Sequence, residues 1–435
     1  MLGSPIVKSL TNTSYKEDFM NGNQGRRAGK LGSIRLLNIF VSCLLFAFLS
    51  CIPSHVQAQD VIRFGASLSL TGKMSTEGRR VRDGYDYYVK HINERGGIPI
   101  KGKNYKVEIV YYDDESDPNT ATRLTEKLIV EDKVDFLLGP YSSTCTMPAS
   151  TVAEKYKMPM VAAHAASTPI FERGYKYLFV TLSSIDQYFG NILKMASELN
   201  PRPQTVALIN ENALAPQISV DAAEAEAQRL GFKIVYKQKY PSGTKDFSSM
   251  LAEIKDKRPD ILLSGSYTSD SLVIVKQAKE MGLKPKMFGI LLGPTLPGFV
   301  DSLKQDAENL LEPIQWSANM SWKDDFFGYD AAEFARIFEK DFGYFPDYHP
   351  PQSAAALLVY QHALQKVGEF DRQKIRDAIA ETNIMTFYGP VRFNEKGQNI
   401  AKGMATVQVQ GGKPFVVYPK AVMEKPLIYP IPGAQ

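Results

Sequence analysis

Short apolar runs alternate with amphipathic stretches along most of this chain, and this alternation constrains the fold more than any other feature. The runs expected to form strands are residues 61–68, 105–112, 134–138, 160–163, 177–181, 205–209, 232–239, 260–264 and 287–291. The stretches between them carry apolar residues at helical spacing. Apolar strands separated by helices are typical of a parallel sheet covered on both faces. The sequence therefore predicts an α/β fold.

The pattern of strands and helices restarts after residue 199, with 287–291 expected as the last strand of the second half. About 375 residues follow the leader segment, which is more than one ordinary hydrophobic core organises. We therefore expect two doubly wound parallel-sheet lobes in tandem. The C-terminal part is expected to be mostly helical, with two strands at 387–393 and 404–410 and an extended tail at 425–435.

The first 58 residues have the composition of a secretory signal peptide. Four basic residues precede an apolar run at 39–52, and the small residues of Val56-Gln57-Ala58 suit a cleavage site. The run is shorter than the roughly 20 residues needed to span a bilayer. We therefore assign residues 1–58 to a signal peptide and expect the remainder in the periplasm. Translation from Met20 and a lipid anchor on Cys51 remain open alternatives.

Removing the leader makes the chain formally neutral. The whole sequence has 51 Lys and Arg against 47 Asp and Glu, and the leader holds six of the former and two of the latter. The remaining 45 of each sign give no electrostatic basis for binding nucleic acid. Two of the three cysteines also lie in the leader, so Cys145 remains alone and no internal disulfide is expected.

Residues 134–168 carry the features most typical of a ligand site. A short apolar strand leads into Gly139-Pro140 and the serine-rich turn Ser142-Ser143-Thr144, which opens a helix. Such hydroxyls cap a helix, and its remaining free N–H groups and positive end attract an anion. Ligands of open parallel sheets collect beyond the carboxyl ends of the strands. The stretch predicts a carboxylate or phosphate site, although a helix cap without a ligand also explains the serines.

The other reactive residues do not form a catalytic or metal-binding pattern. Ser143 and His164 lack a Gly-x-Ser-x-Gly elbow and an acidic partner in order, so no catalytic residue is predicted. The histidines show no metal-ligand spacing, and Asp113-Asp114 and Asp324-Asp325 are expected to be solvated loop ends. We therefore predict no metal and no cofactor, and expect His164 to be the histidine that touches a ligand.

Short motifs follow one another along the mature chain in a recognisable order. They are residues 65–72, 92–98, Tyr112-Asp113-Asp114 with Asp117-Pro118, 139–150, Arg173-Gly174-Tyr175, Lys245-Asp246-Phe247-Ser248, and Gly389-Pro390 with 393–397. Each motif is weak alone. Their order and spacing over residues 60–420 resemble the type I periplasmic binding proteins that serve branched-chain amino acid ABC transporters, the leucine/isoleucine/valine-binding family.

This resemblance implies two α/β lobes joined by three chain crossings, with the ligand between the lobes and a hinge motion that closes over it. We place the crossings near Ser183, Ser317 and Asn394. The expected parts are lobe one at 59–183 plus 318–393, lobe two at 184–317 plus 394–424, and the tail.

The resemblance also implies positions for ligand binding. The serine that holds the ligand carboxylate in this family falls on Ser143, and the carbonyl and hydroxyl of the next loop fall on Ala165 and Ser167. A tyrosine of lobe two falls on Tyr267. Tyr348 precedes the helix at 353–367, a region that often lines the pocket in this family. These positions are consistent with capture of a carboxylate.

Two positions depart from the pattern of an amino-acid binder. Leu291 stands where such proteins place a glutamate that holds the ligand's ammonium, and Ala215 stands in place of a tyrosine. An unpaired ammonium buried beside leucine would cost several kcal/mol. The pocket is therefore expected to be larger and less polar, unless a shifted alignment leaves Glu77 or Glu211 to hold an ammonium. The candidate ligand-binding residues are Ser143, His164, Ala165, Ser167, Tyr267, Leu291 and Tyr348.

We therefore predict a solute-binding protein of an ABC importer that captures a small carboxylate, an aromatic or other bulky apolar acid, between two closing lobes. Two alternatives remain open: a binder of branched-chain or other amino acids in the same transport class, and a ligand-sensing receptor domain of this fold. The expected partners are the carboxylate and an ABC permease of the inner membrane. The protein is expected to be a monomer without enzymatic activity.

Overall fold

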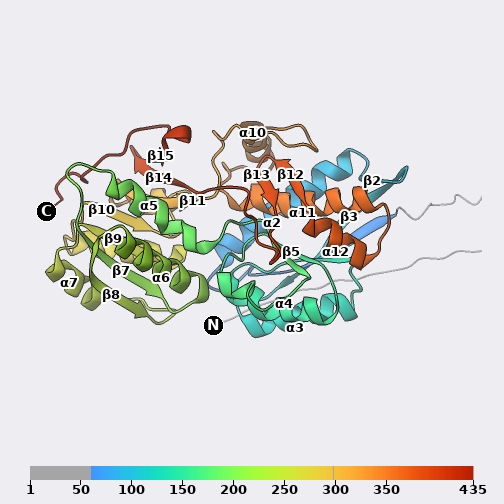
Figure 1. Cartoon of the computed structure of the whole chain (residues 1–435), viewed down its shortest axis with the longest axis horizontal. Helices are drawn as coiled ribbons and strands as arrows, with labels where there is room; N and C mark the ends of the chain where they lie inside the picture. The colour runs from blue at the N-terminus through green and yellow to red at the C-terminus, as the bar shows by residue number, and fades with distance from the viewer. Residues whose placement is uncertain (1–59, 297, 435) are drawn as a thin grey trace, which may run out of the picture. The chain divides into compact units, whose positions relative to one another are not determined.

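The computed structural model describes residues 60–296 and 298–434, so the expected signal peptide at 1–58 lies outside the described residues. Within the described part, the chain forms two large β-sheets packed against helices (Figure 1). The α/β architecture with parallel-sheet lobes that the apolar runs predicted is confirmed.

The first sheet is formed by the N-terminal third of the described chain. Its strand order is β2–β3–β1–β4–β5–β6. The bounds are β1 Val61–Leu68, β2 Ile98–Ile100, β3 Lys103–Asp113, β4 Phe136–Leu138, β5 Met160–Ala162 and β6 Leu178–Val180. All neighbours pair in parallel except β2, which is antiparallel to β3. Strands β4, β5 and β6 are buried along their whole length, which is why their sequences are apolar throughout.

The second sheet has the strand order β15–β14–β11–β10–β9–β7–β8. The bounds are β7 Thr205–Glu211, β8 Lys233–Tyr240, β9 Ile261–Gly265, β10 Met287–Ile290, β11 Leu310–Ile314, β14 Ala405–Gln410 and β15 Lys413–Tyr418. Strands β7 to β11 are parallel to their neighbours, whereas β14 is antiparallel to β11 and β15 is antiparallel to β14.

One expectation about the second sheet is wrong. Residues 287–291 were expected to form its last strand, yet β11 follows β10 and pairs with it in parallel. Glu312 and Pro313 lie in the middle of β11. A proline and an acidic residue argue against a central strand in a sequence, because proline cannot donate to the ladder and a buried acid is costly. Glu312 and Pro313 are therefore the reason why this strand was not predicted from the sequence.

Helices complete the core on both sheets. Those in contact with the first sheet are α2 Ser75–Glu94, α3 Pro118–Val130, α4 Ser143–Lys155 and α11 His349–Val367; those in contact with the second are α5 Tyr188–Ser197, α6 Leu214–Arg229 and α7 Ser248–Lys257. The remaining elements are α8 Thr268–Glu280, α9 Phe299–Leu303, α10 Ala331–Phe342, α12 Arg372–Ala380, a two-stranded sheet of β12 Asn383–Thr386 and β13 Gly389–Arg392, and the 3-10 helices Thr168–Ile170, Ile185–Gln187, Lys304–Ala307 and Lys420–Val422.

Local signals fix where α4 begins. Ser142 precedes the helix, and its Oγ accepts a hydrogen bond from the N–H of Cys145 at 3.2 Å, as an N-cap does. Gly139 lets the chain leave β4 close against β5, because a Cβ at this position would lie 2.4 Å from the Cβ of Ala162. The start of α4 therefore lies directly beyond the carboxyl end of β4.

Hydrogen bonds join one residue from each of the three segments that connect the two sheets. Ser183 follows β6, Gln315 follows β11, and Lys402 precedes β14. The N–H of Ser183 donates to Oε1 of Gln315 at 3.3 Å, and its Oγ donates to the carbonyl of Lys402 at 3.2 Å. Nζ of Lys402 donates to the carbonyl of Gln315 at 2.6 Å. The three connections meet at one buried point, while the boundaries near Ser317 and Asn394 stay predictions.

Helix α11 returns late in the chain to the first sheet. The hydroxyl of its Tyr360 lies 2.7 Å from the carbonyl oxygen of Leu137 and 2.8 Å from that of Pro159. It also accepts from the N–H of Val161 at 3.2 Å. The ring of Tyr360 packs edge-on against Phe64 of β1, with 5.0 Å between the centroids. A side chain from the C-terminal part therefore completes the core of the N-terminal sheet.

Among the described residues, no helix combines the length and the apolar character needed to cross a membrane. The same residues contain no group of three or more His, Cys, Asp and Glu side chains suited to hold a metal ion. Cys145 is a buried free thiol.

Candidate ligand-binding site

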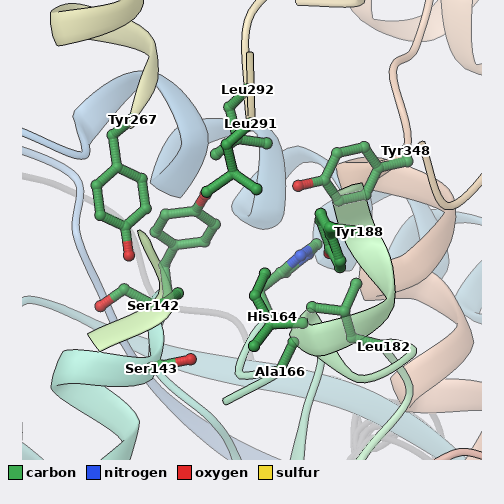
Figure 2. A pocket seen from close by; sticks show the side chains of 13 residues that line it. Ser142, Ser143, His164, Ala166, Leu182, Tyr188, Tyr267, Leu291, Leu292 and Tyr348 are labelled. Carbon is green, nitrogen blue, oxygen red and sulfur yellow. The ribbon is translucent and has the colours of Figure 1, made fainter. Parts of the chain in front are cut away.

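A narrow cavity lies where loops that follow strands of both sheets come together. Its volume is about 40 Å³. It is lined by Tyr141, Ser142, Ser143, His164, Ala166, Leu182, Ile185, Tyr188, Ala215, Tyr267, Leu291, Leu292 and Tyr348. In the view of Figure 2, Tyr267 lies on one side, Tyr188 and Tyr348 on the other, and the two serines below. This is the position in which ligands of parallel sheets are found, beyond the carboxyl ends of the strands.

Two serine hydroxyls, one lining the cavity and one buried next to it, do not donate a hydrogen bond to any described residue. Oγ of Ser143 accepts from the N–H of Ser167 at 3.2 Å, and its own proton has no acceptor within the described part of the chain. Oγ of Ser167 is buried and has no partner among the described residues. The hydroxyl of Ser143 can therefore donate to an anionic oxygen in the cavity, next to the positive end of α4.

His164 contributes an imidazole from the loop after β5. Its Nε2 lies 3.0 Å from Oγ of Ser353 on α11, whereas its Nδ1 is buried without a hydrogen-bond partner in the described residues. Burial lowers the pKa of His164 well below its usual 6.5, and the neighbouring His349 lowers it further. The ring is therefore neutral at physiological pH.

Tyrosine rings form much of the wall. Tyr141 lies 5.7 Å from His164 and 6.5 Å from Tyr267 between ring centroids, and Tyr348 lies 6.0 Å from His164. Burial raises the pKa of the Tyr141, Tyr267 and Tyr348 phenols well above 10, so that all three are uncharged. The hydroxyl of Tyr267 is buried and finds no partner among the residues described. The walls thus combine flat apolar faces with neutral hydroxyl groups.

The described residues that line the cavity include no Lys, Arg, Asp or Glu. Leu291 and Ala215, the two positions at which the resemblance predicts a departure from an amino-acid binder, are both part of the lining. The two acids considered as substitutes, Glu77 and Glu211, are not part of it. The cavity therefore offers hydroxyl donors but no carboxylate to balance a buried ammonium.

Glu77 and Glu211 instead hold the two halves of the molecule together beside the cavity. Nζ of Lys73, in the loop after β1, lies 2.6 Å from a carboxylate oxygen of Glu211 and 2.7 Å from one of Asp270. Glu77 of α2 accepts from the hydroxyl of Thr268 at the start of α8. These contacts connect helices and loops of the first sheet to those of the second.

Glu312 of β11 holds the loop that carries Leu291 and Leu292 through hydrogen bonds to the loop backbone. Its carboxyl group accepts from the N–H of Thr295 at 2.7 Å and from the N–H of Gly293 at 3.3 Å. Complete burial raises the pKa of Glu312 to about 8, so that the group is largely protonated at neutral pH. A neutral acid therefore supports this wall of the cavity.

Five of the seven positions expected from the sequence line the cavity, namely Ser143, His164, Tyr267, Leu291 and Tyr348. Ala165 and Ser167 are fully buried next to it, and Ala166 between them is the lining residue. The contact between Ser143 and the N–H of Ser167 shows that the loop still reaches the serine end of the cavity. A direct role of Ala165 and Ser167 in binding stays a prediction.

Sequence reasoning missed several lining residues. They are Tyr141, Leu182, Ile185, Tyr188, Leu292 and Ala166. Tyr141 directly follows Gly139-Pro140 at the end of β4, and Leu182 follows β6, so the rule that sites lie beyond strand ends pointed to both. Tyr188 begins α5 after the first connection between the sheets, and no local pattern in the sequence indicates that it turns inward.

A model of the family described as periplasmic binding protein matches residues 61–413 of this chain. The leucine-, isoleucine-, valine-, threonine- and alanine-binding protein of Pseudomonas aeruginosa is 25% identical over 375 residues. That alignment covers 85% of this chain and 94% of the relative.

Solved structures show the same fold. A leucine-binding protein of Thermotoga maritima superposes with a TM-score of 0.74 at 21% identity, covering 82% of this chain and 97% of that one. A solute-binding protein of an ABC transporter from R. palustris, solved in complex with benzoate, gives a TM-score of 0.70 at 19% identity and covers 85% and 98% of the two chains. Both matches cover more than four fifths of this chain.

Proposed function

This chain belongs to the periplasmic binding protein family, whose model matches most of its length, and from this premise we propose which solute it carries. It is a solute-binding protein of the ABC-transporter type. The proposed solute is a small aromatic acid, or another carboxylate with a bulky apolar body. The ligand binds between two lobes that close on it and passes to an ABC permease of the inner membrane.

The observation that carries this proposal is the absence of any charged side chain among the described residues that line the cavity. A carboxylate needs only hydrogen-bond donors, and Ser143, Ser167 and the start of α4 supply them. An α-ammonium would be buried beside Leu291 without a counter-charge, at a cost of several kcal/mol. The cavity therefore favours acids that lack an ammonium group.

The shape of the walls supports an aromatic body. Tyrosine faces and the side chains of Leu291 and Leu292 surround the cavity. Ala215 adds space to it, because alanine is smaller than the tyrosine expected at this position in an amino-acid binder. Aromatic rings pack favourably against such faces in offset or edge-on arrangements. The R. palustris neighbour in complex with benzoate has the same fold, and the P. aeruginosa relative is named for amino acids. Amino acids therefore remain the competing class of ligand.

Calorimetric titration of the mature protein separates the two classes. We expect benzoate or a substituted benzoate to bind with micromolar or tighter affinity, about −8 kcal/mol, and leucine and valine to bind far more weakly. Micromolar binding of leucine, with no heat from any aromatic acid, would show that the proposed ligand class is wrong.

A further inference from the structure

We propose that His164 selects ligands that carry a hydrogen-bond donor, such as a ring hydroxyl, in addition to the carboxylate. This inference rests on the proposed function, because it concerns the same cavity and the same ligand. It assigns to His164 a part in specificity that is separate from the carboxylate site at Ser143.

The hydrogen bonds around Ser353 determine which nitrogen of His164 carries the proton. Oγ of Ser353 donates its single proton to the carbonyl of His349 at 2.8 Å, because a carbonyl can only accept. The same Oγ lies 3.0 Å from Nε2 of His164, and both hydrogen bonds form together only when Oγ accepts there and Nε2 donates. The ring is neutral because burial lowers its pKa, and therefore Nδ1 carries a lone pair and no proton.

This lone pair has nothing to bind inside the protein. Nδ1 of His164 is buried and has no hydrogen-bond partner among the described residues, while the side chain lines the cavity. The neighbouring His349 is engaged elsewhere, with Nδ1 bound to Asp347 and Nε2 3.4 Å from the hydroxyl of Tyr141. Leaving this buried acceptor unpaired is energetically unfavourable. A ligand that donates a hydrogen bond to Nδ1 therefore gains affinity.

The donor that fits is a hydroxyl group. An ammonium also donates, but it would bring a positive charge into a cavity whose described lining residues include no acid. A hydroxyl on an aromatic ring donates one proton and adds no charge. A site that hydrogen-bonds a ligand hydroxyl discriminates strongly against the analogue that lacks it, because its own polar group is then left unpaired.

The first test compares ligands on the wild-type mature protein by calorimetry. The probes are benzoate, its three monohydroxy isomers and the corresponding methoxybenzoates. We expect at least one hydroxybenzoate to bind about tenfold more tightly than benzoate, or better, and its methyl ether to lose this advantage because it cannot donate. Equal affinities for benzoate and all hydroxybenzoates overturn the inference.

Variants then locate the effect. His164→Phe keeps a ring but removes the acceptor, so the ratio of the hydroxybenzoate affinity to the benzoate affinity should fall to about one. His362→Phe makes the same change at a histidine outside the cavity and should leave the preference intact. Ser353→Ala leaves Nε2 without its acceptor and allows the other tautomer, so the preference should shrink. A preference that survives in His164→Phe overturns the assignment.

Nitrogen-15 NMR of the labelled wild-type protein tests the tautomer even if a variant fails to fold. We expect the His164 ring to carry its proton on Nε2, with a bare Nδ1 whose signal shifts when the preferred hydroxybenzoate binds. A proton on Nδ1 in the free protein overturns the inference. Failure of the proposed function looks different, because then no aromatic acid binds at all and leucine does.

Discussion

Ser143 shows how one side chain can belong both to the fold and to the site. Its oxygen accepts the N–H of Ser167 and so joins the loop after β5 to the start of α4. Its hydroxyl proton has no acceptor among the described residues and can be donated to a ligand. The neighbouring Ser142 carries the helix-capping role instead, since its Oγ accepts from Cys145. Ligand binding and helix capping therefore fall on adjacent serines.

Replacing Ser143 by alanine should reduce binding more than it reduces stability. We expect Ser143→Ala to weaken binding of an aromatic acid by about 1.5–3 kcal/mol, as for a hydrogen bond to a charged group. The free energy of unfolding should fall by only about 1 kcal/mol, because one neutral hydrogen bond is lost. Calorimetric titration and urea unfolding of the same preparation give the two values.

A buried serine outside the cavity provides the matched control. Ser219 of α6 donates to the carbonyl of Pro216 at 2.8 Å and is not among the lining residues. Ser219→Ala should leave the affinity unchanged. Unaltered affinity in Ser143→Ala, together with a large drop in melting temperature, would assign Ser143 to the fold alone.

Residues at strand ends were the predictable part of the site. Ser143 and His164 follow short apolar strands directly, so the rule for parallel sheets located them without any contact information. Tyr188 was not predictable in this way, because its inward orientation depends on how the connection between the sheets packs. The free Nδ1 of His164 depends on Ser353, which lies 189 residues further along the chain.

Among the secondary-structure elements, too, some were predictable from the sequence and others, such as β11, were not. Strands β1 and β5 were predicted because their sequences are apolar runs of strand length. β11 was missed because Glu312 faces the interior and makes its sequence look like a loop. Only the folded chain brings the N–H groups of Gly293 and Thr295 to that carboxyl group and makes its burial tolerable.

The buried Glu312 should make stability depend on pH. Its pKa is raised from 4.5 to about 8 in the folded protein, so the folded state binds the extra proton. The resulting stabilisation is fully present below pH 4.5 and is lost as the pH rises through about 8. We expect the free energy of unfolding to fall across this window by up to about 1.4 kcal/mol per pH unit. Urea unfolding at a series of pH values measures this slope.

Glu312→Gln should flatten the pH dependence over the same window, because glutamine resembles the protonated acid and does not titrate. Asp114 and Asp324 were expected at solvated loop ends, but both are buried. Burial raises their pKa values to about 6, so they contribute a slope of the same sign at lower pH. Subtracting the pH slope of the variant from that of the wild type cancels the contribution of Asp114 and Asp324. A variant with the slope of the wild type would contradict the role given to Glu312, and Glu395→Gln at the surface is the control.

At the scale of the whole molecule, ion pairs and hydrogen bonds join the two halves beside the cavity. Lys73 pairs with Glu211 and Asp270, and Glu77 with Thr268, across the boundary between the two halves. The cavity between them is narrow. The three connecting segments meet at Ser183, Gln315 and Lys402, so rotation about that point would open the cavity without breaking either sheet.

Ligand should therefore compact the protein. Small-angle X-ray scattering should give a smaller radius of gyration at saturating aromatic acid than without it, because binding favours the closed state. Lys73→Met should weaken binding by about 1 kcal/mol, as for a partly exposed ion pair. Its counterpart Lys155→Met removes an exposed pair with Glu126 far from the cavity and should have no effect. Identical scattering with and without ligand would argue against a hinge.

The return of α11 to the first sheet has a consequence for biosynthesis. The ribosome delivers β1 to β6 early, but Tyr360, which bonds to the backbone of β4, is synthesised 223 residues after Leu137. Until that helix emerges, the N-terminal sheet has an unfilled core and its apolar faces stay exposed. The core of the first sheet can therefore be completed only after α11 has been made. Late completion of this core would suit export of an unfolded chain, which the signal peptide predicted from the sequence implies.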